Sequence, residues 1–312
     1  MQKIKIGTRG SALALTQTDQ VIDQLRQIHP EWEIEKVILR TEGDRILDRP
    51  LIDFGGKGVF INEFEEALLD GRIDLAVHSA KDMPMELADG LTIAGTLSRE
   101  DARDVLVTRR GVRLSNQVPD VESTDEAVTD ASIVIGTGSL RRQLQLRELY
   151  PDVVCKGLRG NVPTRLQKIQ GGQCDGVVLA AAGLKRLGRM REPGLQYHCF
   201  SYEEMVPAGG QGIIAIEGRK GDVVTELVRG ISDGNTYLEL ETERRVLSLL
   251  GADCHEAVGV ISKIRRERIS LCLIREEAGV IYRSQGEDSV ANRLQLAKRL
   301  VNRVTGQRNT PQ

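Results

Sequence analysis

Residues 3–28 read KIKIGTRGSALALTQTDQVIDQLRQI, and this stretch decides the fold class. KIKIG at 3–7 reads as a strand, and the run from Ser11 to about Ile28 is amphipathic with helical spacing. A strand that passes through a short turn into a helix is the building unit of α/β proteins. The stretch therefore predicts an α/β fold.

The rest of the first hundred residues repeats this alternation. The strand-like and helix-like runs are EIEKVILR at 33–40, a helix near 60–69, IDLAVHS at 73–79 and LTIAGTL at 91–97. Strands that alternate with helices favour a parallel sheet covered on both faces. We therefore predict a mainly parallel, covered sheet.

A second α/β unit follows from the same alternation. Its runs are DVLVT at 104–108, SIVIGTG at 132–138, SLRRQLQLRELY at 139–150, VVCKGL at 153–158, NVPTRLQKIQGG at 161–172 and GVVLA at 176–180. The polar segment near 111–130 is predicted to be a surface excursion of this unit. GIIAIEG at 212–218 adds one more strand.

The last eighty residues show a different order of elements. A helix over 232–250, with Ser232 or Asp233 near its start, precedes three short strands within 257–286 and a helix over 289–304. Strands in succession followed by a helix are typical of an α+β unit. We predict a third, smaller α+β unit here.

Composition excludes several classes of protein. The 312 residues have 3% aromatic content and a net charge of −2, which excludes binding of single-stranded nucleic acid by stacking and by a bulk positive field. No apolar run of 18 residues and no signal-peptide pattern occurs in the sequence, so a cytoplasmic protein without a membrane partner is expected. The five cysteines contain no CxxC pair, so neither a disulfide framework nor a zinc site is expected.

Three turns between a strand and a helix carry a hydroxyl group and an arginine. They are IGTRGS at 6–11, IGTGSLRR at 135–142 and GLRGNVPTR at 157–165, and AAGLKRLG at 181–188 adds Lys185 and Arg186 after another strand. Helix N-termini and arginine forks both bind carboxylates and phosphates. One such turn alone reads as a helix cap with a solvated arginine, but together they predict a site for a small polyanion.

VHSAKDMP at 77–84 ends a strand with His78, Ser79, Lys81 and Asp82. Sites of α/β proteins assemble where strands end. Asp82 either forms a plain salt bridge with Lys81 or stabilises a developing cation and moves a proton. His78 is equally consistent with a structural hydrogen bond.

Two further segments remain open on local chemistry alone. Lys57 in FGGKGVF at 54–60 lies either in a flexible loop or in a lid over bound substrate. In GADCHEAVG at 251–259 the consecutive Cys254, His255 and Glu256 do not favour one tetrahedral ion, so Cys254 is a plausible exposed thiol and no more.

Taken in order, these motifs closely resemble the porphobilinogen deaminase family. The resemblance runs through TRGSALAL, GGKGVF, AVHSAKDMP, REDARD, GTGSLRR, LRGNVPTRL, AAAGLKRLG and PAGGQGIIAIE to the Cys254 loop, and covers nearly the whole chain. This sequence differs from the usual family pattern at Gly138, in PAGGQG, and at Asp253, His255 and Ala257 around the cysteine.

The resemblance implies three domains. Two α/β domains similar to periplasmic binding proteins would enclose a cleft, and a smaller α+β C-terminal domain would carry the cysteine. The implied boundaries are 1–98 with 203–230 for domain 1, 99–202 for domain 2 and 231–312 for domain 3.

The resemblance also implies the reaction. A transferase of this family, also called hydroxymethylbilane synthase, joins four porphobilinogen molecules head to tail with loss of ammonia at each step. Water then releases linear hydroxymethylbilane for tetrapyrrole (heme) synthesis. Cys254 would hold a dipyrromethane cofactor through a thioether, and Asp82 would be the catalytic carboxylate. A monomer is expected, with porphobilinogen as the small-molecule partner.

Matching positions extend the implied site. The cofactor would contact Lys81, Ser79, Ser139, Arg141, Arg142 and Asp82 besides Cys254. The substrate would contact Arg9, Ser11, Lys57, Arg159, Arg165, Arg186 and Gln211. Two alternatives remain at this point: a non-catalytic two-lobed protein that binds small anions, and a thiol-dependent hydrolase that uses Cys254 and His255.

Overall fold

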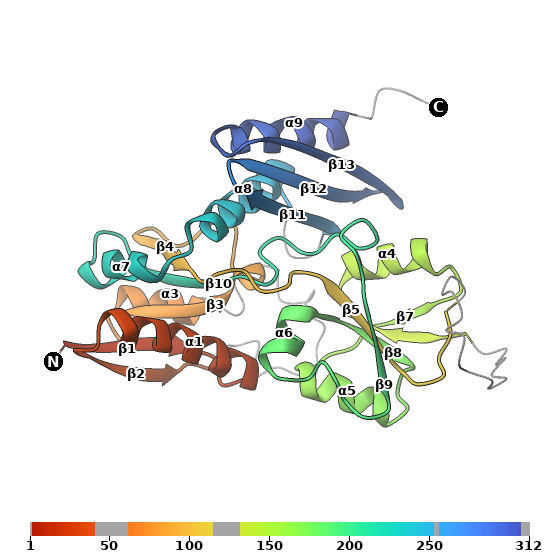
Figure 1. Ribbon diagram of the computed structural model, residues 1–312, viewed down its shortest axis with the longest axis horizontal. Helices are drawn as coiled ribbons and strands as arrows, with labels where there is room; N and C mark the ends of the chain where they lie inside the picture. The colour runs from red at the N-terminus through yellow and green to blue at the C-terminus, as the bar shows by residue number, and fades with distance from the viewer. Residues whose placement is uncertain (1, 41–61, 115–131, 253–255, 307–312) are drawn as a thin grey trace.

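The computed structural model describes residues 2–40, 62–114, 132–252 and 256–306, which form three sheets with their helices (Figure 1). The first sheet has the strand order β2-β1-β3-β10-β4. Its strands are β1 Gln2–Thr8, β2 Trp32–Ile38, β3 Leu75–Ser79, β4 Leu91–Thr96 and β10 Ile214–Arg219. Its helices are α1 Ala12–Ile28, α3 Asn62–Leu69, α7 Val223–Leu227 and the short 3₁₀ turns η2 Ala80–Asp82 and η3 Val228–Ile231.

Helix α1 confirms the helix predicted from residue 11 to 28. The Ser11 hydroxyl accepts a hydrogen bond of 3.2 Å from the Ala14 N–H, which caps the first turn. Val21, Ile22 and Leu25 recur on one face and are buried against the first sheet. Each such side chain contributes about 1.5–3 kcal/mol by leaving water, so packing holds this helix in place.

The second sheet has the strand order β7-β6-β8-β5-β9. Its strands are β5 Asp104–Arg109, β6 Val134–Gly136, β7 Val154–Lys156, β8 Gly176–Ala180 and β9 Leu195–Cys199, and its helices are α4 Leu140–Leu149, α5 Val162–Gln170 and α6 Ala181–Arg186. Strand β9 and helix α6 were not predicted: β9, LQYHC, lacks an apolar run such as that of β8, and the six residues of α6 are too few to show a helical period.

The two larger sheets are mainly parallel, as predicted, but each contains one antiparallel strand. β1 is parallel to β2 and β3, but β10 is antiparallel to both of its neighbours. In the second sheet β5 is the antiparallel strand. The chain crosses between the sheets at residues 97–103 and 200–213, and both crossings arrive where parallel strands end, since Asp104 pairs with Ala180 and Ile214 with Ser79. The incoming strand must therefore run the other way.

The third sheet lies over the two crossing segments (Figure 1). It is an antiparallel meander of β11 Val258–Arg265, β12 Arg268–Glu277 and β13 Val280–Ser289, with helices α8 Gly234–Leu250 and α9 Arg293–Gly306 and the turn η4 Val290–Asn292. One face packs on α8 and α9, and the other presents Ile261 and Ile274 to Ala102 and Val206 of the crossings. This confirms a smaller α+β unit after two α/β units.

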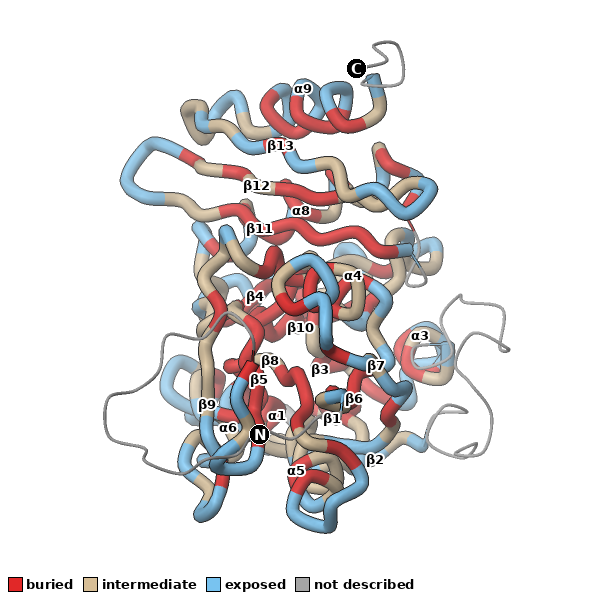
Figure 2. Tube along the Cα trace, turned by 90° about the vertical axis from the view of Figure 1, so that its right-hand side faces the viewer, coloured by how far each residue is buried: buried red, intermediate tan, exposed pale blue. Residues whose placement is uncertain are grey.

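Burial follows the same plan, with buried stretches concentrated in the strands of the three sheets (Figure 2). Each sheet lies within one of the three predicted domains, whose residue boundaries stay a prediction. None of the described helices is long and apolar enough to span a bilayer.

Candidate active site

The candidate site lies where strands of the two larger sheets end and the chain crosses between them. Ser79 at the end of β3 pairs with Ile214, and Ala180 at the end of β8 pairs with Asp104. The residues after these strand ends are the charged motifs identified in the sequence. The fold thus brings segments from both lobes to one place.

Asp82 closes the 3₁₀ turn that follows β3. The Ala80 N–H donates to the Ile213 carbonyl at 3.0 Å, and Met83 is buried, so the turn is fixed at both ends. Asp82 itself is exposed, whereas Lys81 is half-buried. Burial lowers the pKa of the Lys81 ammonium; the Asp82 carboxylate opposes this, and the positive charges of the nearby arginines add to it.

Arg141 and Arg142, on the first turn of α4, are bound by one carboxylate. Arg141 Nη1 donates to Asp104 Oδ2 at 2.7 Å and to the Val206 carbonyl at 2.7 Å. Arg142 donates to Asp104 Oδ1 from Nε and Nη2, and to the Val178 carbonyl from Nη1. All three side chains are buried. Burial alone would raise the pKa of Asp104, but the two guanidinium groups hold that pKa well below its usual range.

Gln211 lies inside the same cluster. Its side-chain Nε2 donates to the Ala102 carbonyl at 2.7 Å and to Asp104 Oδ1 at 3.0 Å, and the residue is 1% exposed. Both amide hydrogens therefore have partners in the protein. The side-chain Oε1 is buried and has no hydrogen-bond partner among the described residues.

Two more candidate site arginines, Arg165 and Arg186, lie on helices α5 and α6 of the second sheet. Arg165 Nε donates to the Gly160 carbonyl at 2.7 Å, and burial together with the charge of Arg142 lowers the pKa of Arg165 to about 10. Arg186 Nη2 donates to the Gly212 carbonyl at 2.8 Å, and burial lowers its pKa to about 10. Both guanidinium groups remain charged near neutral pH. Arg159 is half-buried in the loop before α5.

The hydroxyl residues mainly have structural partners. The side chain of Ser11 caps α1, and the Ser79 hydroxyl exchanges hydrogen bonds with the Gln17 amide at 2.9 and 3.2 Å. Ser139 is the N-cap residue of α4, but its side chain makes no capping bond.

The remaining candidate residues are Arg9, Lys57 and Cys254. Arg9 is half-buried in the turn before α1. Lys57 and Cys254 lie outside the described residues.

His78 lies in the packing of the first sheet, and its Nε2 makes no hydrogen bond among the described residues. Its Nε2 lies 3.0 Å from Glu217 Oε2, and both side chains are buried in the first sheet. The ring also packs edge-on against Phe64. His78 therefore belongs to the support of β3 rather than to the charged cluster.

The cluster has an excess of positive charge. Among the described residues, the carboxylates whose charges act on Lys81, Arg141, Arg142 and Arg165 are those of Asp82 and Asp104. Buried cations need counter-charges, so the site suits a ligand with several carboxylates. Among the described residues no group of histidine, cysteine and acidic side chains is arranged to hold a metal ion.

Asp104 is a residue that sequence reasoning missed. It begins strand β5, in the motif REDARD, where several acids lie close together and none is distinguished by spacing. An acid that directly precedes the apolar run VLV was the available signal, since a buried carboxylate must have partners.

Comparison with known proteins gives a consistent result. Residues 4–226 match the family model described as porphobilinogen deaminase, dipyrromethane cofactor binding domain. A porphobilinogen deaminase of Streptococcus sanguinis is 39% identical over 308 residues, which cover 97% of this chain and 96% of the relative. One of Syntrophus aciditrophicus is 42% identical over 312 residues, with 96% and 95% covered.

Solved structures also align with the chain. The effector-binding domain of BenM, with its effector benzoate, has 18% sequence identity and a TM-score of 0.41, and the alignment covers 80% of this chain and 94% of that one. The Escherichia coli sulphonate-binding protein SsuA has 14% identity and a TM-score of 0.40, with 80% and 71% covered.

Proposed function

The chain belongs to the porphobilinogen deaminase family, and from this premise we propose that it joins four porphobilinogen molecules head to tail and releases hydroxymethylbilane. Family membership supports an enzyme with porphobilinogen as its substrate. It therefore disfavours the alternative of a non-catalytic protein that binds small anions. The reaction class that we propose is group transfer.

The excess of positive charge at the lobe junction is the observation that carries this proposal. Each porphobilinogen brings an acetate and a propionate, so the product gains two negative charges with every unit added. In the part of the chain that the structure describes, Lys81, Arg141, Arg142 and Arg165 share the two carboxylates of Asp82 and Asp104, and an anionic ligand would supply further counter-charge. A neutral or cationic substrate would leave these cations uncompensated.

Asp82 is the residue that we assign to the chemical step. The C–N bond of the aminomethyl group breaks and ammonia leaves, so a positive charge develops on the pyrrole. The exposed carboxylate of Asp82 stabilises this charge and hydrogen-bonds the pyrrole N–H. The free α-carbon of the terminal pyrrole of the growing chain then forms a C–C bond to this electrophilic methylene carbon and loses its proton. Water adds in the last step and frees the tetrapyrrole.

We assign the cofactor to the same charged cluster. A bound dipyrromethane supplies the free α-carbon to which the first substrate is joined. Cys254 would hold it through a thioether, and its carboxylates would contact Lys81, Arg141 and Arg142. The remaining assigned residues then orient the incoming substrate; they are Arg9, Ser11, Lys57, Arg159, Arg165, Arg186 and Gln211.

Intact mass spectrometry tests family, cofactor and anchor together. The purified enzyme should be heavier than its sequence by two pyrrole units, and Cys254→Ala should abolish this increment. An unmodified wild-type mass that does not increase on incubation with porphobilinogen would disprove the proposal. We also propose that the enzyme is a cytoplasmic monomer that needs neither nucleic acid nor a membrane.

A further inference from the structure

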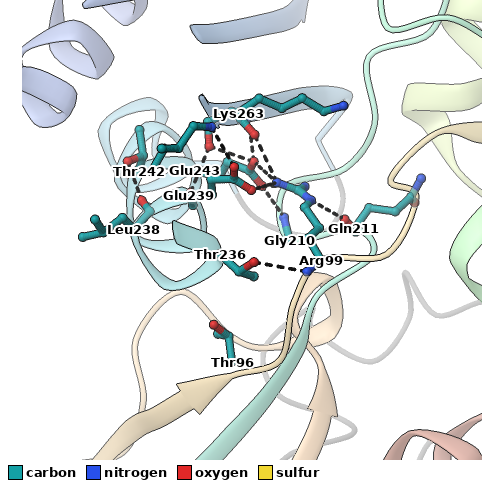
Figure 3. A network of polar contacts seen from close by, with 12 residues as sticks. Thr96, Arg99, Gly210, Gln211, Thr236, Leu238, Glu239, Thr242, Glu243 and Lys263 are labelled. Atoms are coloured by element: carbon teal, nitrogen blue, oxygen red, sulfur yellow. Dashed lines mark hydrogen bonds and ion pairs between the residues drawn. The ribbon is translucent and has the colours of Figure 1, made fainter. Parts of the chain in front are cut away.

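Glu243 of helix α8 is a buried carboxylate with every acceptor position occupied (Figure 3). Oε1 accepts from Arg99 Nη1 at 2.6 Å, from the Ser262 N–H at 2.7 Å and from the Ser262 hydroxyl at 3.0 Å. Oε2 accepts from the Gly210 N–H at 2.7 Å and from Arg99 Nη2 at 3.2 Å. Glu243 thus joins the third domain to both crossing segments.

Arg99 extends this connection along the first crossing segment. Its Nε donates to the Gln211 carbonyl at 3.0 Å, and its backbone N–H donates to the Thr236 hydroxyl at 3.1 Å (Figure 3). A second carboxylate, Glu239, lies 3.4 Å from Nη1. One guanidinium group therefore holds the two crossings and helix α8 together.

Residues 209–212 of the second crossing, here called the glycine turn, connect this network to the catalytic turn, which is the 3₁₀ turn Ala80–Asp82. A Cβ atom on Gly210 would lie 2.9 Å from the backbone of both Ala80 and Lys81, so the two turns are in direct contact. The Gly210 carbonyl also accepts from the Ile213 N–H, and the Ile213 carbonyl accepts from the Ala80 N–H. One rigid path therefore leads from Glu243 to the residue next to Asp82.

On one side this network borders open space and not packed side chains. A cavity of about 670 Å³ lies beside Arg99, and residues from both crossings, α8 and β11 line it. Tyr202 and Lys263 are among the lining residues, whereas Asp82 and the clustered arginines are not. On this side polar contacts join α8 to the crossings, and elsewhere along the helix Leu240 packs with Met83 and Ile213.

We propose that Glu243 is a positioning residue for the reaction: through Gly210 it fixes the turn of Lys81 and Asp82 relative to the third domain. The inference rests on the proposed function, in which that domain carries the covalent cofactor on Cys254. The carboxylate of Glu243 then keeps the position of Asp82 constant relative to the anchored pyrrole chain during each addition. It does this without touching substrate or cofactor.

Glu243→Gln tests the proposal, because a glutamine cannot satisfy all of these donors. Either orientation of its amide places an NH₂ group against the N–H of Gly210 or of Ser262. We expect kcat per cofactor-loaded molecule to fall by roughly 10- to 100-fold, since displacements near 1 Å have effects of that order. The matched control is Glu241→Gln. Glu241 lies on α8 like Glu243, and its ion pair with Arg293 of α9 is at the surface, so its loss should leave kcat unchanged.

A charge-free double variant separates positioning from folding. Replacing Arg99 and Glu243 together by methionine removes their buried ion pair and leaves Glu239 with the Ile264 N–H, so stability should recover relative to Glu243→Gln. The Gly210 N–H still lacks its acceptor, and we expect kcat per loaded molecule to stay low while the melting temperature recovers. Turnover that recovers with the melting temperature, or turnover within twofold of wild type in folded Glu243→Gln, would overturn the inference. Wild-type protein that carries no cofactor or does not consume porphobilinogen would instead overturn the proposed function.

Discussion

Asp104 Oδ1 lies 2.7 Å from Arg142 Nη2, and the two side chains are 0% and 8% exposed. The same carboxylate accepts from Arg141, so one buried anion orients two buried cations. The arginines that the sequence predicted as ligands for carboxylates are thus held in advance by a carboxylate of the protein. A preorganised guanidinium binds an incoming anion with less loss of side-chain entropy.

Asp104→Asn should lower the free energy of unfolding by about 3–5 kcal/mol, because it leaves two buried guanidinium groups without a counter-charge. Urea unfolding followed by circular dichroism measures this change. The control is Asp19→Asn, whose exposed pair with Lys36 should contribute less than about 1 kcal/mol. Equal effects of the two substitutions would contradict a stabilising role for Asp104.

Acid should remove the contribution of Asp104 in a defined direction. The folded-state pKa is lowered below the unfolded value of about 3.9, so its stabilisation is complete above about pH 4 and is lost as the pH falls through the folded-state pKa. The stability difference between wild type and Asp104→Asn should therefore shrink below pH 4. A difference that stays constant from pH 7 to pH 2 would show that the pKa of Asp104 is the same in the folded and unfolded states.

Asp82→Asn should reduce kcat by about 10²- to 10⁴-fold and leave cofactor loading intact, because the amide keeps the shape and loses the charge. Single-turnover kinetics with porphobilinogen and intact mass measure the two quantities separately. Asp89→Asn, an exposed acid seven residues later, is the control and should behave as wild type. Normal turnover of Asp82→Asn would remove Asp82 from its assigned role.

The sequence predicted the elements that have a clear period and the turns that join them. Helix α1 and its Ser11 cap follow directly from spacing and capping chemistry. The direction of β5 and β10 was not predictable, because it depends on where the chain crosses between the lobes and not on local pattern. Short elements such as α6 were missed for lack of length.

The sequence predicted which residues belong to the candidate site but not which protein groups they contact. Arg141, Arg142 and Gln211 were singled out as ligand contacts, and the structure surrounds them with protein acceptors that lie far away in the sequence. Glu243 was missed, although it occupies an apolar position of α8 between Leu240 and Val246. A charged residue on a buried helix face is the signal that sequence reasoning can use in such cases.

Removal of the cofactor should make the protein respond to added anions. Without its covalent ligand, Cys254→Ala protein keeps the excess of positive charge and should bind sulfate there. We expect 50 mM sodium sulfate to raise its melting temperature by about 2 °C or more beyond the shift of the loaded wild type. Sodium chloride of equal ionic strength serves as the control for screening. Identical sulfate shifts in both proteins would contradict a charge excess that the cofactor neutralises.

Gly210→Ala and Gly221→Ala separate backbone strain from the contact between the two turns. Both glycines have a positive φ, +75° and +74°, so alanine costs roughly 1–2 kcal/mol of strain at either position. Only at Gly210 would the new methyl group press on Ala80 and Lys81, since nothing lies within 4 Å of the Cβ position at Gly221. Gly221→Ala should therefore lower only the melting temperature, whereas Gly210→Ala should also lower kcat per loaded molecule. If both variants kept wild-type kcat, the catalytic turn would tolerate displacement by the glycine turn, and contact between them would not control turnover.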